Sequence, residues 1–139
     1  MDTKYFEKIR IFDGGMGQEL LSKGLISKGT LWSASALIER EFHKLVIDAH
    51  ISYINAGADI IVSNNFSARK IRFIQNKVLD KFQYANEQAG ILANKAREIS
   101  KQNILIAGSL PSQSDTYVED ARSSSEIQSD FEEQAKIIS

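Results

Sequence analysis

The residues with the clearest chemical potential form a short acidic and glycine-rich segment, Asp13-Gly14-Gly15-Met16-Gly17. The segment follows an apolar run and precedes an amphipathic one, so a carboxylate stands where a strand gives way to a turn. Glycines permit positive φ and let a ligand approach the backbone closely. Asp13 is therefore a candidate for binding an amine or a hydroxyl group. The alternative is a tight turn in which Asp13 caps the next helix, and the spacing favours neither.

Small and polar residues also follow two further predicted strands. Ser63-Asn64-Asn65 comes after one of them and Gly108-Ser109 after the other. In a parallel sheet the carboxyl ends of the strands share one edge, and ligands bind at that edge. We therefore expect these two clusters to lie beside the acidic glycine-rich segment. This convergence predicts a binding site without reference to any family.

The elements that must position these clusters alternate between strand and helix patterns. Strands are expected at 9–12, 59–63 and 103–108, and helices at 18–23, 37–56, 82–99 and from 123 onwards. Ser35 is a candidate N-cap and Gly57 a candidate stop for the helix over 37–56. The spacing of Ser123 and Glu126 is that of a capping box. Strands that alternate with helices predict an α/β fold with a parallel sheet and right-handed crossovers.

Composition excludes several classes of function. The 17 basic and 18 acidic residues give a net charge of −1, which argues against nucleic acid or an anionic membrane as the main partner. No apolar run approaches the roughly 20 residues of a membrane span. The N-terminus lacks an apolar signal region, which favours a cytoplasmic location. Cysteine is absent, so thiol catalysis and cysteine-ligated metals are excluded within these residues.

The expected sheet is incomplete by itself. Three parallel strands leave two open edges, and the chain reaches Ser139 near the end of a predicted helix. A complete barrel of parallel strands takes about 250 residues. We therefore expect residues 1–139 to be the front portion of a longer fold, incomplete at its C-terminus.

Several segments resemble the homocysteine S-methyltransferase family, in the right order across nearly the whole chain. They are Asp13-Gly14-Gly15-Met16-Gly17-x-Glu19-Leu20, Leu31-Trp32-Ser33-Ala34 with the later Ala56-Gly57-Ala58-Asp59, Ser63-Asn64-Asn65-Phe66, and Ala107-Gly108-Ser109-Leu110-Pro111 followed by Tyr117. The resemblance implies a TIM (β/α)8 barrel, of which this chain would hold about the first three βα units. It also implies a methyltransferase that methylates the thiol of homocysteine to give methionine.

The resemblance assigns roles to five residues. Asp13 is expected to bind the substrate ammonium, Gly14 and Gly15 to form the turn beside it, and Asn64 and Asn65 to lie at the pocket mouth. The family also uses zinc, held by three cysteines, to present a thiolate. This sequence has no cysteine, so the zinc ligands are expected outside it and the chain alone is expected to be inactive. The methyl donor, whether S-methylmethionine, a folate, betaine or S-adenosylmethionine, stays open.

Other candidate residues have more ordinary explanations. His43 and His50 are seven residues apart on a predicted helix, about 10.5 Å, which is too far for one metal ion. Trp32 is expected to anchor a loop rather than to line a pocket, whereas Tyr117 is a pocket candidate through the resemblance alone. A basic run is expected to be a solvated helix face, although it could attract an anionic methyl donor. It comprises Arg69, Lys70, Arg72, Lys77 and Lys81.

Two other functions remain as alternatives. The chain could be a non-catalytic subunit or binding module that completes its sheet with another chain. It could also belong to a barrel enzyme with a different metal or with none.

Overall fold

The computed structural model describes residues 3–114 and 119–139. Short 3-10 helices are η1 (Thr3–Glu7), η2 (Gly29–Ala34), η3 (Arg40–Phe42) and η4 (Leu79–Lys81). The α-helices are α1 (Met16–Ser22), α2 (Ser35–Ile38), α3 (His43–Asn55), α4 (Lys70–Gln75), α5 (Phe82–Ser100) and α6 (Ser124–Ile138). The strands are β1 (Ile60–Val62) and β2 (Leu105–Ala107). The predicted pocket residue Tyr117 lies outside the described residues.

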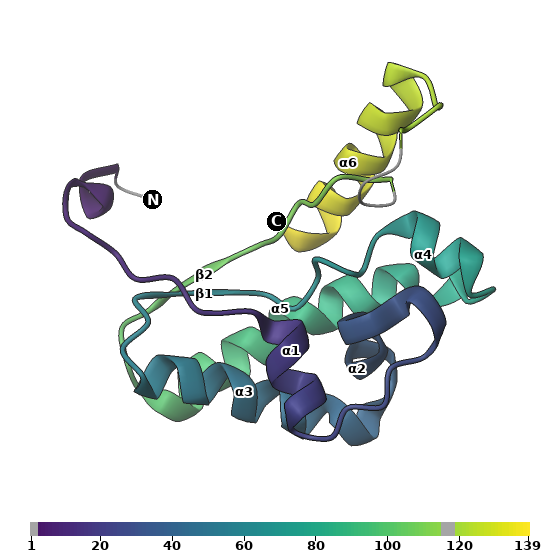
Figure 1. Cartoon of the computed structure of the whole chain (residues 1–139). Coiled ribbons are helices and arrows are strands. Elements are labelled where there is room, and N and C mark those ends of the chain that lie inside the picture. The colour runs from purple at the N-terminus through teal and green to yellow at the C-terminus, as the bar shows by residue number, and fades with distance from the viewer. Residues whose placement is uncertain (1–2, 115–118) are drawn as a thin grey trace.

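The two strands form a parallel sheet, as the alternation of elements predicts. Ile60 pairs with Leu105 and Val62 with Ala107. Helices α1, α2, α3 and α5 lie on one side of the strands, and the long helices α3 and α5 pack against each other (Figure 1). The hydrophobic core between these layers includes Leu20, Leu37, Val46, Ile61 and Phe73. The result is a helix-rich α/β fold.

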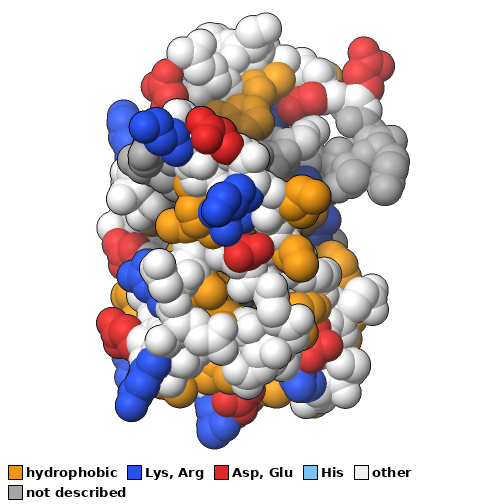
Figure 2. Space-filling model, turned by 90° about the vertical axis from the view of Figure 1, so that its left-hand side faces the viewer, with side chains coloured by type: hydrophobic (Ala, Val, Ile, Leu, Met, Phe, Trp, Pro, Cys, Tyr) orange, Lys and Arg blue, Asp and Glu red, His pale blue; other side chains and the backbone are white. Residues whose placement is uncertain are grey.

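The expected first strand over 9–12 is reduced to a single bridge. Phe12 pairs in parallel with Ile60, and the backbone N–H of Asp13 donates to Ile60 O at 2.9 Å. Ile9 is 95% exposed and Phe12 54% exposed, because no layer of the described residues covers this segment. Figure 2 shows such hydrophobic side chains between charged ones on one face of the molecule. The segment still delivers Asp13 to the carboxyl edge of the sheet.

The single helix predicted over 37–56 is broken into α2, η3 and α3. Glu39 adopts an extended conformation, with φ −99° and ψ 107°. Ser35 is not an N-cap, because it is the first residue of α2 and its hydroxyl accepts the Lys28 N–H at 2.9 Å. The His43 ring donates through Nε2 to Leu37 O at 2.9 Å, next to the break. Gly57 ends the helical region at φ +102°, as predicted.

The predicted apolar stripe matches the buried face of α5 more closely than that of α6. The stripe from Phe82 to Ala96 on α5 is buried, although Ile99 at its end is 53% exposed. On α6 the predicted Ser123 and Glu126 capping box is present. However, the fully buried side chain of α6 is Gln134, whereas the predicted apolar stripe is half-buried. Helix α6 therefore attaches to the body through buried polar contacts as well as through partly buried apolar side chains.

Candidate functional site

The three strand ends meet around one cavity of about 560 Å³. Its lining includes Asp13 after the first segment, Asn64 after β1 and Ser109 after β2. The convergence predicted from strand ends therefore holds. The rest of the lining comprises Phe12, Gly14, Gly15, Met16, Gly17, Gln18, Trp32, Ser33, Val62, Ser63, Phe66 and Ser67. The wall is mostly apolar, with one carboxylate and several hydroxyl groups, which suits a small molecule with one charged end.

The Asp13 carboxylate is held in place by the backbone of β1. Its Oδ2 accepts the Val62 N–H at 3.0 Å. Burial raises the pKa of Asp13, and the backbone hydrogen bonds partly oppose this effect. A carboxylate has about four acceptor positions, so these contacts leave capacity for a ligand. Asp13 does not cap the next helix, because α1 has Gly15 at its N-cap and no side-chain cap.

Close packing, rather than positive φ, explains Gly14 and Gly17 but not Gly15. Among the described residues, the glycines with positive φ are Gly24, Gly29 and Gly57. A Cβ on Gly14 would come within 2.9 Å of Tyr53 Cε1, whereas a Cβ on Gly15 would meet nothing within 4 Å. The ring of Tyr53 therefore lies directly behind the turn, and burial, then Glu19 and Asp13, raise its pKa.

The two adjacent asparagines have different positions. Asn64 lines the cavity, and its Nδ2 donates to Ser33 O at 3.1 Å. Asn65 is fully buried behind the wall rather than at the mouth. Its Nδ2 donates to Ser109 O at 2.7 Å, and its Oδ1 accepts the Ser109 N–H at 3.1 Å. Asn65 thus joins the ends of β1 and β2, a role that its position in the sequence did not signal.

Trp32 lies in the cavity wall, contrary to its expected role as a loop anchor. Its ring lies so close to α1 that a Cβ on Gly17 would be 3.0 Å from Cη2 and Cζ2. Its backbone has φ 48° and ψ −123°, the first central position of a type II′ turn, which glycine ordinarily occupies. Such a conformation costs about 1–3 kcal/mol and clusters at functional sites.

The family model described as homocysteine S-methyltransferase matches residues 10–139 of this chain. The chain belongs to the homocysteine S-methyltransferase family. It is 31% identical over 115 residues to homocysteine S-methyltransferase of Escherichia coli K12, covering 75% of this chain and 35% of that protein. It is 39% identical over 64 residues to homocysteine S-methyltransferase 1 of Zea mays, covering 46% of this chain and 19% of that protein.

The fold agrees with that family. The crystal structure of the Escherichia coli homocysteine methyltransferase MmuM, metallated form, superposes with a TM-score of 0.77 at 23% identity. The superposition covers 98% of this chain and 52% of that one. The chain thus spans about half the length of the MmuM structure, and a smaller share of the Escherichia coli K12 and Zea mays sequences.

The residues present do not fit the zinc site that the family implies. The sequence has no cysteine, and the described residues contain no group of three His, Cys, Asp or Glu side chains able to hold a metal. His43 bonds to a backbone carbonyl, and His50 is fully buried. Burial lowers the pKa of His50 to about 4, so it is neutral at pH 7. No chemical step of this chain is therefore assigned to a metal.

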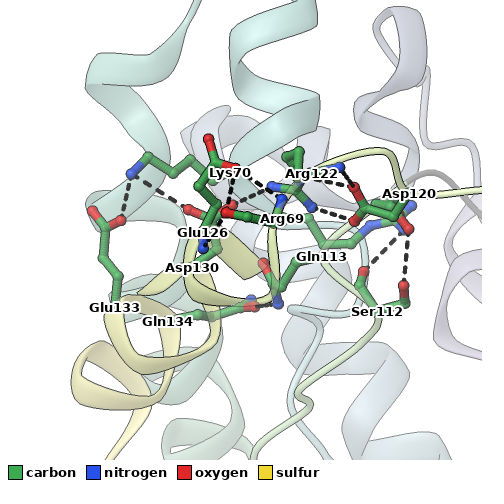
Figure 3. A network of polar contacts seen from close by, with 12 residues as sticks. Arg69, Lys70, Ser112, Gln113, Asp120, Arg122, Glu126, Asp130, Glu133 and Gln134 are labelled. Atoms are coloured by element: carbon green, nitrogen blue, oxygen red, sulfur yellow. Dashed lines mark hydrogen bonds and ion pairs between the residues drawn. The ribbon is translucent and has the colours of Figure 1, made fainter. Parts of the chain in front are cut away.

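The basic run is a solvated face only in part, because Lys77 and Lys81 are exposed whereas Arg69 and Lys70 are engaged in contacts. Arg69 is 1% exposed and donates through Nη1 to Ser112 O at 3.2 Å. Lys70 pairs with Glu133 at 2.6 Å and with Asp130 at 3.6 Å. Figure 3 shows Lys70, at the start of α4, joined to Asp130 and Glu133 of α6. Arg69 and Lys70 thus join parts of the fold, so at these two positions the run does not offer an open anionic-donor site.

Proposed function

We propose that this chain provides the amino-acid-binding part of an enzyme that transfers a methyl group to the sulfur of homocysteine. The donor's bond to the methyl group breaks, a bond to the homocysteine sulfur forms, and the thiol proton is lost, which gives methionine. Family membership supports the reaction. The observation that carries the binding role is the Asp13 carboxylate in the wall of the cavity at the strand ends.

Residues 1–139 are proposed to form the opening part of a (β/α)8 barrel, with about three of its βα units. The parallel register, the helices on one side of the strands and the superposition on MmuM support this assignment. In such a barrel the cavity would open at the carboxyl face, where barrel enzymes place their active sites.

The proposed contact is a charge-assisted hydrogen bond from the substrate ammonium to Asp13. The Val62 N–H fixes the carboxylate, so little side-chain freedom is lost on binding. Gly14 and Gly15 would let the substrate lie against the backbone, and Asn64 would contribute to the polar wall. Asn65 would act only by holding the strand ends in place. The methyl donor would approach from the sulfur end of the substrate.

Calorimetric titration of homocysteine into wild type and Asp13→Asn tests the binding role. The substitution keeps the shape and an acceptor for Val62 but removes the charge. We expect affinity to fall by roughly tenfold or more, the loss of a hydrogen bond to a charged group. Asp48→Asn, at an exposed Lys44 pair, is the matched control. 4-Mercaptobutyrate, which lacks the amino group, should bind wild type and Asp13→Asn alike. Equal homocysteine affinity in these two proteins would refute the role of Asp13.

A further inference from the structure

The strained Trp32 belongs to a loop that is anchored on both of its sides. A strained residue persists only where the surrounding structure holds it. Thr30 lies two residues before Trp32 and Ser33 directly after it, and each is bonded to a different element. The contacts of these two neighbours therefore decide where the indole stands in the cavity wall.

Thr30 is bonded to the C-terminal end of α4 by several groups at once. Asn76 Oδ1 accepts the Thr30 N–H at 3.3 Å, and Asn76 Nδ2 donates to Thr30 Oγ1 at 2.7 Å. Thr30 Oγ1 donates to Gln75 Oε1 at 3.2 Å, and Arg72 donates to Thr30 O. We call the contacts of Thr30 with Arg72, Gln75 and Asn76 the α4 latch.

The approach of α4 to this loop is sterically tight. A Cβ on Gly29 would lie 2.1 Å from Asn76 Oδ1, and Gly29 has φ +50°. Glycine suits position 29 because of its backbone conformation, and a side chain there would displace Asn76. The Asn76 side chain packs closely against Gly29 in this loop.

On the other side of Trp32, Ser33 is bonded to residues that follow β1. Asn64 Nδ2 donates to Ser33 O at 3.1 Å, and Ser33 Oγ donates to Ser67 Oγ at 3.4 Å. This anchor belongs to the cavity itself, since Ser33, Asn64 and Ser67 all line it. The α4 latch, in contrast, lies outside the cavity lining.

We propose that Asn76 is a positioning residue of the cavity: through Thr30 it holds Trp32 in the wall, although it does not line the cavity itself. The latch and the Ser33 anchor fix the backbone on both sides of Trp32, which keeps its φ positive. Loss of the latch lets the backbone at Trp32 relax, and the indole leaves its place beside Gly17. The inference rests on the proposed function only for what occupies the cavity.

The emission of Trp32 tests this directly, because it is the only tryptophan in the chain. The measurements are the emission maximum and acrylamide quenching of the ligand-free, full 139-residue chain, with circular dichroism to confirm folding. Each hydrogen bond removed should shift the balance toward the released loop roughly fivefold. We expect Asn76→Ala to give red-shifted emission and a larger quenching constant with native helix content.

Asn76 Nδ2 also donates to Arg72 O at 2.7 Å, so Asn76→Ala could fray α4. Thr30→Ala therefore serves as a second variant, since it removes the hydroxyl contacts from the loop side and leaves that bond intact. Asn94→Ala is the matched control, because Asn94 bonds to Gly90 O within α5 and to Arg97. Unchanged emission and quenching in Thr30→Ala would overturn the proposal, as would an equal change in Asn94→Ala. The assay uses no ligand, so failure of the methyl-transfer proposal would not alter these results.

Discussion

The glycines of the glycine-rich turn differ in whether a side chain is disfavoured at each position. Gly14 gives space to Tyr53 and Gly17 gives space to Trp32, while no described atom would contact a Cβ on Gly15. Gly15 is therefore free to serve a ligand, whereas its neighbours serve the packing of the protein. The two roles can be separated by alanine substitution.

Gly14→Ala should lower the free energy of unfolding by about 1–3 kcal/mol, because the new methyl group forces Tyr53 to move. Gly15→Ala should change it by at most about 0.5 kcal/mol. Urea denaturation of both variants measures the difference. Equal stabilities would show that Tyr53 moves aside without cost.

His50 should make stability fall in mild acid. Its pKa is lowered from 6.5 to about 4 by burial, so the unfolded chain takes up a proton at a higher pH than the folded chain does. Stability is therefore lost as the pH falls from 6.5 toward 4, by about 3 kcal/mol in total. Urea denaturation across this window should show a shallower loss in His50→Leu than in wild type. Equal slopes in His50→Leu and wild type would contradict this assignment.

At the scale of the elements, α6 is held by a fully buried polar side chain in addition to partly buried apolar ones. Gln134 Nε2 donates to Asn86 Oδ1 at 3.0 Å and to Ala68 O at 3.2 Å, while its Oε1 accepts from Gln113 at 2.8 Å. Gln134 is fully buried, so these hydrogen bonds are shielded from water. Ion pairs of Lys70 and Arg122 with Asp130 close the outer side of the same contact (Figure 3).

Gln134→Ala should destabilise the protein by about 2 kcal/mol or more, since several buried hydrogen bonds are lost together. Gln128→Ala, at an exposed position of the same helix, should change stability by at most about 0.5 kcal/mol. Hydrogen exchange should show the extra opening concentrated in α6. Equal protection of α6 in the two variants would contradict this account.

The sequence pattern predicted the structure correctly where it depends on the spacing of nearby residues. It predicted the structure wrongly where it depends on contacts with residues far along the chain. Helix α5 followed from its spacing, and Asp13 and Asn64 reached the cavity because parallel strands share an edge. At the break, Glu39 pairs with Lys28, and Gln134 bonds to Asn86 in the interior, which no periodicity reveals. Trp32 was misplaced for the same reason, because its backbone conformation is set by contacts with other elements.

At the scale of the whole molecule, the chain carries a candidate substrate cavity but not the family's metal site. No described helix is both apolar enough and long enough to cross a membrane. The relatives are longer than this chain, so substrate binding and zinc binding have to be measured on the chain itself. Binding of an amino acid and binding of zinc should be separable in this chain.

Equilibrium dialysis of the 139-residue chain against zinc should show no tight one-to-one binding. The chain lacks thiolates, and its two histidines are engaged or buried. Homocysteine titration without added zinc supplies the comparison. Tight stoichiometric zinc would show that ligands other than cysteine form a site, and that these residues do fit the metal.

The hydrogen bonds between the Asn65 side chain and Ser109 also favour the correct alignment of β1 and β2. The Asn65 amide bonds to both backbone groups of Ser109, so it fixes the alignment of β1 and β2 as a further pair of the ladder would. A slip by one residue moves the partner by about 3.3 Å and removes two hydrogen bonds from a buried amide. A misaligned sheet is thus penalised at the edge where the cavity forms, before any ligand arrives.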